Sequence, residues 1–351
     1  MKNIIFKIII SIIIILLLVI VYCLAQVYLP TNSISQPADF TITQGEGVKI
    51  IGAHLKQINL INSQFIFETL VYLRQNETKF LAGKYSIKSP ISLNQLVDLL
   101  TTNPLSQDKE IKVLEGWSVQ QIGQYLENNG YKQTEELLEV VGFPTIDYRQ
   151  HPELPKLVDF TKQYQFLQDK PTWLGLEGYL FPDTYRVYYN FSVEDLTRKM
   201  LNNFDKKLTV KMRQEIDRQE RTIFEVITMA SLIEKEASNS QDKKIVADVF
   251  YKRLLAGMSL QSCATVNYLL GRPKEQLTYQ DIKIVSPYNT YLHAGLPPGP
   301  ICNPGIDSIE AAIWPTKTDY WYFLSDPTDT NLVFSKNKAE HDRNKIKYLS
   351  N

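Results

Sequence analysis

The most continuous hydrophobic pattern in the chain is a run near its N-terminus. From Ile8 to Ala25 no residue is charged, and most are Ile, Leu or Val. A helix needs roughly 20 mostly apolar residues to cross a bilayer, whereas the apolar part of a cleaved signal peptide spans about 7–15. We therefore predict a retained transmembrane helix within residues 1–25. Because Lys2 and Lys7 precede the run, the single-pass anchor should leave the N-terminus in the cytoplasm and the following residues outside the cytoplasmic membrane.

Residues 26–40 have no hydrophobic period and contain Pro, Ser, Thr and Asn, which indicates a linker. Strand-like and helical patterns then follow over residues 41–115. The patterns predict strands near 39–43, 83–87 and 110–113, and helices near 48–55, 63–74 and 92–100. Their order indicates a small β-α-α-β subdomain, a kind of unit that often binds polymers.

The remaining residues, 116–351, form a third region. A helix capped at residues 116–118 is expected to run to Leu126. Residues 130–172 are polar, irregular and rich in proline, and we interpret them as an insertion or a lid. From Trp173 onward aromatic residues and Gly-Pro clusters are frequent, so we expect the catalytic residues there. The predicted fold class is α+β: a transmembrane helix, a small β-α-α-β subdomain and a mixed α+β catalytic domain.

Charge and composition exclude several classes of function. Lys plus Arg and Asp plus Glu both number 38, so the net charge is zero and no basic surface for nucleic acid is indicated. The four histidines form no H-E-x-x-H motif, and neither a P-loop nor a G-x-S-x-G motif occurs. We therefore predict no metal site and no cofactor. A nucleophile–base pair of Cys263 and His293 is a minor alternative.

Cys263 and Cys302 are the only cysteines that follow the apolar run. In an oxidising compartment an even pair of cysteines permits one disulfide. On spacing alone, two buried free thiols are nearly as compatible with the sequence.

Aromatic residues and carboxylates are concentrated in Leu176–Tyr185. Within these ten residues lie Glu177, Tyr179, Asp183 and Tyr185. Aromatic faces can stack on the C–H faces of sugars, and carboxylates can accept hydrogen bonds from sugar hydroxyls, so the segment suits a saccharide cleft. A core strand followed by a turn is the structural alternative.

Two carboxylates lie near the end of a predicted helix at residues 224–238. Its apolar stripe is formed by Val226, Ala230, Ile233 and Ala237. Glu234 and Glu236 flank this stripe, while Lys235 is expected to point away from it. A partly desolvated carboxylate has a raised pKa, as a general acid requires at neutral pH. The helical wheel does not choose between the two glutamates, and a solvated helix end is the simpler interpretation.

Two loop regions supply further candidates. Arg253–Val266 reads as a helix, a glycine stop and a polar loop that contains Gln261. Ser286–Pro300 contains a stiff Gly-Pro-rich loop, together with Tyr288, Asn289 and Tyr291. Tyr and Asn side chains can donate hydrogen bonds to the hydroxyl and N-acetyl groups of sugars. Ordinary structural loops explain both regions equally well.

Taken in order, five motifs resemble the endolytic murein transglycosylase (MltG, YceG-like) family. They are EGYLFPDTY from Glu177, ASLIEKEA from Ala230, GMSLQS from Gly257, YNTY from Tyr288 and GLPPGPICNPG from Gly295. The likeness extends from about residue 40 to about residue 345. It implies a LysM-like subdomain at 41–115, a YceG-like catalytic domain at 116–351, and attachment to the cytoplasmic membrane.

The resemblance also implies a role for Glu236, the second glutamate of the Glu-Lys-Glu motif, as the catalytic acid. Such an enzyme cleaves the β-1,4 bond between N-acetylmuramic acid and N-acetylglucosamine within nascent peptidoglycan strands. It leaves 1,6-anhydro ends, terminates elongation and works near penicillin-binding proteins. Candidates for binding the glycan are Glu177, Tyr179, Asp183, Tyr185, Gln261, Tyr288, Asn289 and Tyr291.

Two positions depart from the family pattern. Cys263 stands where many members carry Asp, and Cys302 stands where others carry a small residue; together they suggest a disulfide that joins two loops. Since the Asp is replaced, a muramidase that uses Glu236 with water is an alternative. A non-catalytic scaffold that binds peptidoglycan is a second alternative.

Overall fold

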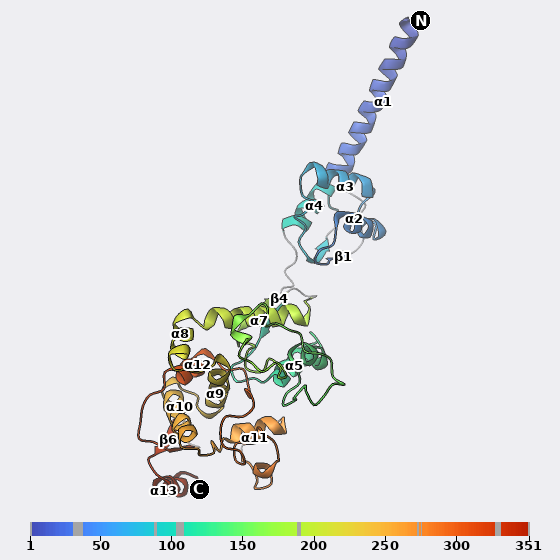
Figure 1. Ribbon diagram of the computed structural model, residues 1–351. Coiled ribbons are helices and arrows are strands. Elements are labelled where there is room, and N and C mark those ends of the chain that lie inside the picture. The colour runs from blue at the N-terminus through green and yellow to red at the C-terminus, as the bar shows by residue number, and fades with distance from the viewer. Residues whose placement is uncertain are drawn as a thin grey trace. The chain divides into compact units, whose positions relative to one another are not determined.

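The computed structural model of the protein describes residues 2–30, 38–87, 90–102, 109–187, 191–271, 274, 276–326 and 331–349. The chain divides into two compact units (Figure 1). The first comprises residues 1–109 and 186–191, and the second comprises residues 110–185 and 192–351. The predicted domain boundary, between residues 115 and 116, lies six residues after this division. Most of the predicted linker, residues 31–37, lies outside the described residues.

The first unit is a small α+β structure with an N-terminal helix. Its elements are α1 (Lys2–Tyr28), β1 (Ala38–Ile42), α2 (Val48–Gln57), α3 (Gln64–Leu73), β2 (Gly83–Ile87) and α4 (Leu93–Thr102). Strands β1 and β2 pair antiparallel, with Phe40 opposite Tyr85. The predicted β-α-α-β order is confirmed. Gly52 lies within α2, where it faces α3. A Cβ at this position would lie 3.0 Å from the Phe67 ring, so the glycine allows α2 and α3 to pack closely.

Helix α1 includes the whole predicted membrane span. Its apolar side chains from Ile13 to Tyr22 are exposed. Within the described ranges, however, no helix meets both the length and the apolarity that a bilayer crossing requires. The structure therefore does not confirm the predicted transmembrane helix.

The second unit is mainly helical with short strand pairs, so the predicted α+β class is confirmed. Its elements are β3 (Lys109–Lys112), α5 (Val119–Asn128), α6 (Thr134–Val141), η1 (Gln165–Leu167), β4 (Thr184–Val187), α7 (Val193–Lys207), α8 (Val210–Arg218), α9 (Ile223–Glu236), α10 (Ser240–Leu255), α11 (Cys263–Leu270), η2 (Asp281–Lys283), α12 (Ile306–Ile313), β5 (Tyr322–Ser325), β6 (Leu332–Ser335) and α13 (Lys338–Leu349). Strand β3 pairs with β4, and β5 pairs antiparallel with β6.

Helix α9 is at the centre of the second unit. It packs against α8, α10, α11 and α12. Every residue from Val226 to Ile233 is buried, so the prediction of a single apolar stripe is wrong for most of this helix. Both ends of α9 reach the surface, since Glu225 in the first turn and Lys235 in the last turn are exposed.

The irregular segment at residues 130–172 is packed into the second unit. Helix α6 contacts both α5 and α7, and its Leu137 and Val141 are fully buried. The backbone N–H of Leu176 donates a hydrogen bond to the Val141 carbonyl at 2.6 Å. A Cβ on Gly142 would lie 2.6 Å from the Gly175 Cα, so these two backbone segments require glycine. Whether the segment is an insertion stays a prediction.

Candidate active site

The end of α9 places three charged residues at the edge of the core. A capping box of Thr222 and Glu225 starts the helix, and Ala237 ends it in an extended conformation (φ −138°, ψ 141°). Glu234, Lys235 and Glu236 therefore occupy the last turn, where the helix leaves its buried surroundings. Each of the three faces a different neighbour.

Glu234 is fully occupied by structural contacts. Its carboxylate accepts hydrogen bonds from the Gly305 N–H at 3.0 Å and the Ser308 hydroxyl at 2.6 Å, both at the start of α12. It also pairs with the Lys243 ammonium at 3.3 Å, and both side chains are nearly inaccessible. Glu234 thus ties α9 to α10 and α12.

Glu236 is half-buried and faces the loop before α11. The Ser262 hydroxyl donates a hydrogen bond to its Oε1 atom, and the Ala264 backbone also bonds to the carboxylate. Burial raises the pKa of Glu236, while the Ser262 hydroxyl, the Arg253 charge and the Ala264 backbone oppose the rise by favouring the charged form. A carboxyl that is raised in pKa and accessible on one side is suited to donate a proton.

The loop that holds Ser262 is itself fixed. The Ser262 N–H donates to Thr290 Oγ1 at 3.0 Å, and the Gln261 N–H donates to the Thr290 carbonyl at 3.1 Å. The buried Arg253 guanidinium donates to the Leu260 carbonyl at 2.7 Å. Gln261 has φ = 53°, a left-handed conformation, and its side chain is exposed. The hydroxyl that contacts Glu236 is therefore positioned by several bonds.

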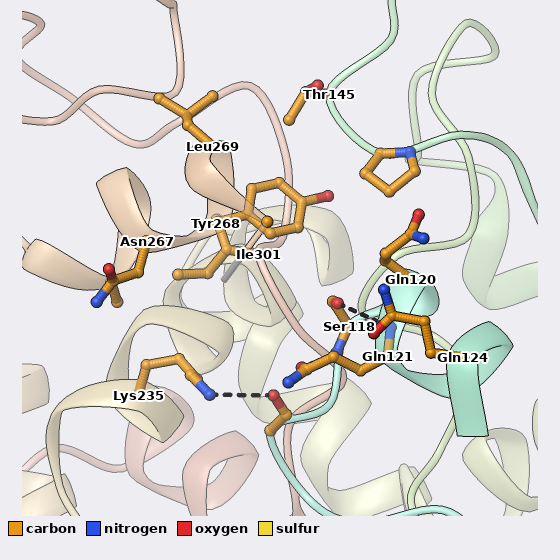
Figure 2. A pocket seen from close by; sticks show the side chains of 14 residues that line it. Ser118, Gln120, Gln121, Gln124, Thr145, Lys235, Asn267, Tyr268, Leu269 and Ile301 are labelled. Carbon is orange, nitrogen blue, oxygen red and sulfur yellow. Dashed lines mark hydrogen bonds between the residues drawn. The ribbon is translucent and has the colours of Figure 1, made fainter. Parts of the chain in front are cut away.

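A cavity of about 430 Å³ lies beside the last turn of α9; Lys235 lines it, but Glu236 is not among its lining residues. Figure 2 shows side chains of α5 and α11 on its two sides, with Thr145 at the top of the view and Lys235 near the bottom. Lys235 and Ala264, which line it, also flank or contact Glu236. The Lys235 ammonium donates to the Gly116 carbonyl at 3.3 Å. Lys235 is exposed and points away from the apolar stripe, as predicted, and it lines the cavity.

Glu177 forms a second, deeper carboxylate centre. Its oxygens accept hydrogen bonds from the Val119 N–H at 3.1 Å, the Asn303 amide at 3.1 Å and the Tyr268 hydroxyl at 3.2 Å. Burial raises the pKa of Glu177 to about 8, although these hydrogen bonds favour the charged carboxylate and lower its pKa. Tyr288 packs against Tyr268 with a ring separation of 5.5 Å. Because Tyr268 also lines the 430 Å³ cavity, Glu177 supports the cavity wall from behind.

The structure brings some predicted residues together. Tyr291 Oη lies 3.0 Å from Cys263 Sγ, and the Tyr291 and Cys263 side chains both interact electrostatically with Glu236. Gln261 lies on the same loop. Asn289, by contrast, is fully buried, and its amide donates to the carbonyls of Ile282 and Ile284. It shapes the loop and cannot contact a glycan, so its predicted binding role is wrong.

Three predicted residues lie in a different environment. Tyr179 is fully buried against Phe204 with a ring separation of 5.3 Å, so its predicted contact with substrate is wrong. Asp183 and Tyr185 both accept hydrogen bonds from Asn203 of α7, at 3.0 and 3.1 Å. Helices α7 and α11 lie at opposite ends of the second unit (Figure 1). The aromatic cluster near Asp183 is therefore a core element and not part of the cleft.

The cysteines are free thiols, so the predicted disulfide is wrong. Cys302 is buried, and its Sγ donates to the Ser231 carbonyl at 3.3 Å inside the core. Cys263 is exposed at the start of α11 beside Tyr291. Within the described ranges, no group of three or more His, Cys, Asp or Glu could hold a metal ion.

Sequence reasoning did not single out Asn303, Tyr268, Ser262 or Lys235. The fully buried Asn303 accepts hydrogen bonds from the N–H groups of Gly178 and Leu180 and donates to the Trp117 carbonyl. It therefore joins segments that lie more than a hundred residues apart. A polar residue inside the rigid GPICNPG loop was the available signal for Asn303. Ser262 was marked only by its place next to Gln261.

Comparisons with known proteins agree with this architecture. A model of the YceG-like family matches residues 40–347. The chain is 33% identical over 316 residues to a Bacillus subtilis (strain 168) protein named endolytic murein transglycosylase, which covers 89% of this chain and 85% of the relative. It is 31% identical over 324 residues to a Streptococcus pneumoniae (strain R6) protein of the same name, covering 88% of this chain but 58% of that relative.

The crystal structure of a YceG-like protein from Listeria monocytogenes also matches. Its TM-score is 0.57 at 31% identity, and the match covers 88% of this chain and 99% of that one. Family match, sequence identity and fold all agree, and the chain belongs to the YceG-like family.

Proposed function

We propose that the chain cuts peptidoglycan glycan strands internally and that Glu236 is its catalytic acid. The chain is a lyase of the endolytic murein transglycosylase class, in keeping with its family and its named relatives. The bond that it cuts, the form of the products and the roles of individual residues are our proposal. The observation that carries it is the half-buried Glu236 carboxyl, held by Ser262 and by the backbone of Ala264, a residue that lines a polar cavity.

The proposed reaction needs one carboxyl group. Protonated Glu236 donates its proton to the β-1,4 glycosidic oxygen that follows N-acetylmuramic acid, and the C1–O bond breaks. The carboxylate then accepts the proton of the C6 hydroxyl of the same sugar, whose oxygen attacks C1. The products are a 1,6-anhydro end and a free C4 hydroxyl, and no water is consumed. Intramolecular attack is favoured because effective molarities can reach roughly 10⁵ M or more.

The contacts of the two glutamates support this choice of acid. Glu234 already satisfies two donors and an ammonium, and its carboxylate is buried. Glu236 keeps an accessible side, and its raised pKa favours the protonated form from which an acid must start. Ser262 and the Ala264 backbone orient the carboxyl without closing it off.

The test is cleavage of purified peptidoglycan by Glu236→Gln. We expect the variant to fold normally and to release no fragments, since an amide cannot donate the proton. Wild-type cleavage by this variant would refute the assignment. A product that carries a reducing end instead of an anhydro end would favour a muramidase that uses the same glutamate.

We further propose that α1 anchors the protein in the cytoplasmic membrane with its N-terminus inside. The uncharged run from Ile8 to Ala25 and its exposed apolar side chains support this proposal. The anchor would keep the active site close to nascent strands and to the penicillin-binding proteins that make them. After cell fractionation, the full chain should stay in membranes washed at high pH, and a chain without residues 1–30 should not. Release of the full chain by the wash would contradict the anchor.

The first unit is proposed to act as a LysM-like glycan-binding module. Its β-α-α-β order supports this role, as do two exposed aromatic residues of α3, Phe65 (77% exposed) and Tyr72 (70% exposed). They are seven residues apart, so they share one helix face and could stack on successive sugars. Replacing both with Ala in the Glu236→Gln protein should weaken binding of glycan strands. Unchanged binding would contradict the role.

A further inference from the structure

The cavity beside the last turn of α9 has an unusual charge distribution. It is lined by Gly116, Ser118, Gln120, Gln121, Gln124, Pro144, Thr145, Lys235, Ala264, Asn267, Tyr268, Leu269, Gly271 and Ile301. Among these described lining residues, Lys235 is the only charged one. The cavity therefore presents a single positive charge in neutral surroundings.

The Lys235 ammonium has little to neutralise it. It donates a hydrogen bond to the Gly116 carbonyl at 3.3 Å, near the limit of such a bond, and within the described ranges no carboxylate lies within ion-pair distance. The nearby Lys243 differs, since it pairs with Glu234. Lys235 is exposed toward the cavity (Figure 2), and two of its three N–H donors are free for a ligand.

The other polar groups of the cavity suit a saccharide. Gln120 and Gln124 lie one turn apart on α5, and neither side chain has a hydrogen-bond partner among the described residues. Tyr268 offers an aromatic ring from α11 on the other side (Figure 2). Gln121 and Asn267 are occupied by the N-cap of α5 and by the Lys274 backbone. A volume of about 430 Å³ is sufficient for a small ligand.

We propose that this cavity binds a sugar that carries a carboxylate and that Lys235 pairs with that carboxylate. The inference rests on the proposed function, because the muramyl sugar of peptidoglycan is the one that bears a lactyl ether. The lactyl carboxyl is free in strands without peptides; in other strands it is bound to a stem peptide that has carboxylates of its own. Ala264 lines the same cavity and its backbone bonds to the Glu236 carboxylate, so the ion pair would hold the muramyl sugar next to the segment that contacts the acid.

The experiment compares Lys235→Gln with Lys235→Arg, using Lys206→Gln on the exposed face of α7 as the matched control. The substrates are peptide-free strands, the same strands with methyl-esterified carboxyls, and peptide-bearing strands. We expect Lys235→Gln to raise KM roughly tenfold with little change in kcat, and Lys235→Arg to keep most of the affinity. Esterification should raise the wild-type KM similarly but cause no further increase in Lys235→Gln.

The substrates also identify the source of the carboxylate. A higher KM of Lys235→Gln on peptide-free strands assigns the carboxylate to the lactyl group. A higher KM only on peptide-bearing strands assigns the carboxylate to the stem peptide. Both results support the site. Equal KM values for wild type and Lys235→Gln on all three substrates would overturn it. The site would also be overturned if Lys235→Gln raised KM equally on esterified and on free strands, since that result indicates a structural role of Lys235.

Binding separates this inference from the proposed function. Strand affinity is measured by calorimetry for Glu236→Gln and for the double variant with Lys235→Gln. Weaker binding by the double variant supports the carboxylate site even if Glu236 is not the acid. Equal binding refutes the site even if Glu236 is the acid.

Discussion

The hydroxyl of Ser262 donates a hydrogen bond to the carboxylate of Glu236, and two residues earlier Glu234 is bound by Ser308, Gly305 and Lys243. One helix end thus carries two carboxylates with different tasks. Glu234 fastens three helices, and Glu236 faces Ser262 and Ala264 in the segment at the start of α11. The difference arises from their partners and not from their spacing in the sequence.

Substituting the two glutamates should separate activity from stability. We expect Glu236→Gln to lower the rate of strand cleavage about a thousandfold or more, because general acid catalysis is lost. We expect Glu234→Gln to lower the free energy of unfolding by about 3 kcal/mol, because Lys243 is left buried without its partner. Cleavage assays and urea unfolding of both variants measure these effects. The distinction would be contradicted if Glu236→Gln lost stability but not activity, and Glu234→Gln lost activity but not stability.

Ser262 should set the pH range of activity. Its hydroxyl favours the charged form of Glu236 and so lowers the pKa of that carboxyl; in Ser262→Ala the pKa should rise further. Because an acid works while protonated, the alkaline limb of the kcat/KM profile should move to higher pH, while the maximum falls as orientation is lost. Ser262→Thr keeps the hydroxyl and should resemble wild type. An unshifted alkaline limb in Ser262→Ala would contradict the contact.

Glu177 should make stability depend on pH. Burial raises its pKa from 4.5 to about 8, so the folded protein keeps a proton that the unfolded chain releases. The unfolded state then binds fewer protons between these values, and the free energy of unfolding should fall as pH rises from 4.5 to 8. Urea unfolding across this range measures the slope. Glu177→Gln removes the titrating group, and an equally steep slope in that variant would exclude Glu177 as its source.

The two thiols of the second unit should differ in reactivity. Cys263 is exposed as a residue and should react with a maleimide in the native protein. The reaction should be slow at neutral pH, because its sulfur is partly desolvated and the pKa of the thiol is therefore raised. Cys302 is buried and should react only after unfolding. A label on Cys263 would lie beside Tyr291 and Glu236, so we expect it to inhibit cleavage. Inhibition that persists in Cys263→Ser would place the reactive group elsewhere.

Local patterns predicted much of the fold. The helices and strands of the first unit could be predicted from the spacing of their hydrophobic residues and from capping residues, because each element buries one face against its neighbours. Helix α9 was also predicted, but its burial was not, since a helix packed on all sides loses the amphipathic pattern. The aromatic segment at Tyr179 was assigned to the cleft because a sugar platform and an aromatic core have the same composition.

The cavity itself could not be predicted. Its walls come from α5 and α11, which are more than a hundred residues apart, and nothing local indicates that Gln120 faces Tyr268. The direction of Lys235 depends on the Gly116 carbonyl, supplied by another distant loop. Glu236 was selected through family resemblance, and its contacts now supply a physical basis for that choice.

The most direct test of the central claim is digestion of peptidoglycan in water labelled with heavy oxygen, followed by mass spectrometry of the fragments. If Glu236 directs the C6 hydroxyl to C1, wild-type products will carry anhydro ends that are one water lighter and free of heavy oxygen, and Glu236→Gln will release none. Reducing ends that contain heavy oxygen, or unchanged products from Glu236→Gln, would contradict it.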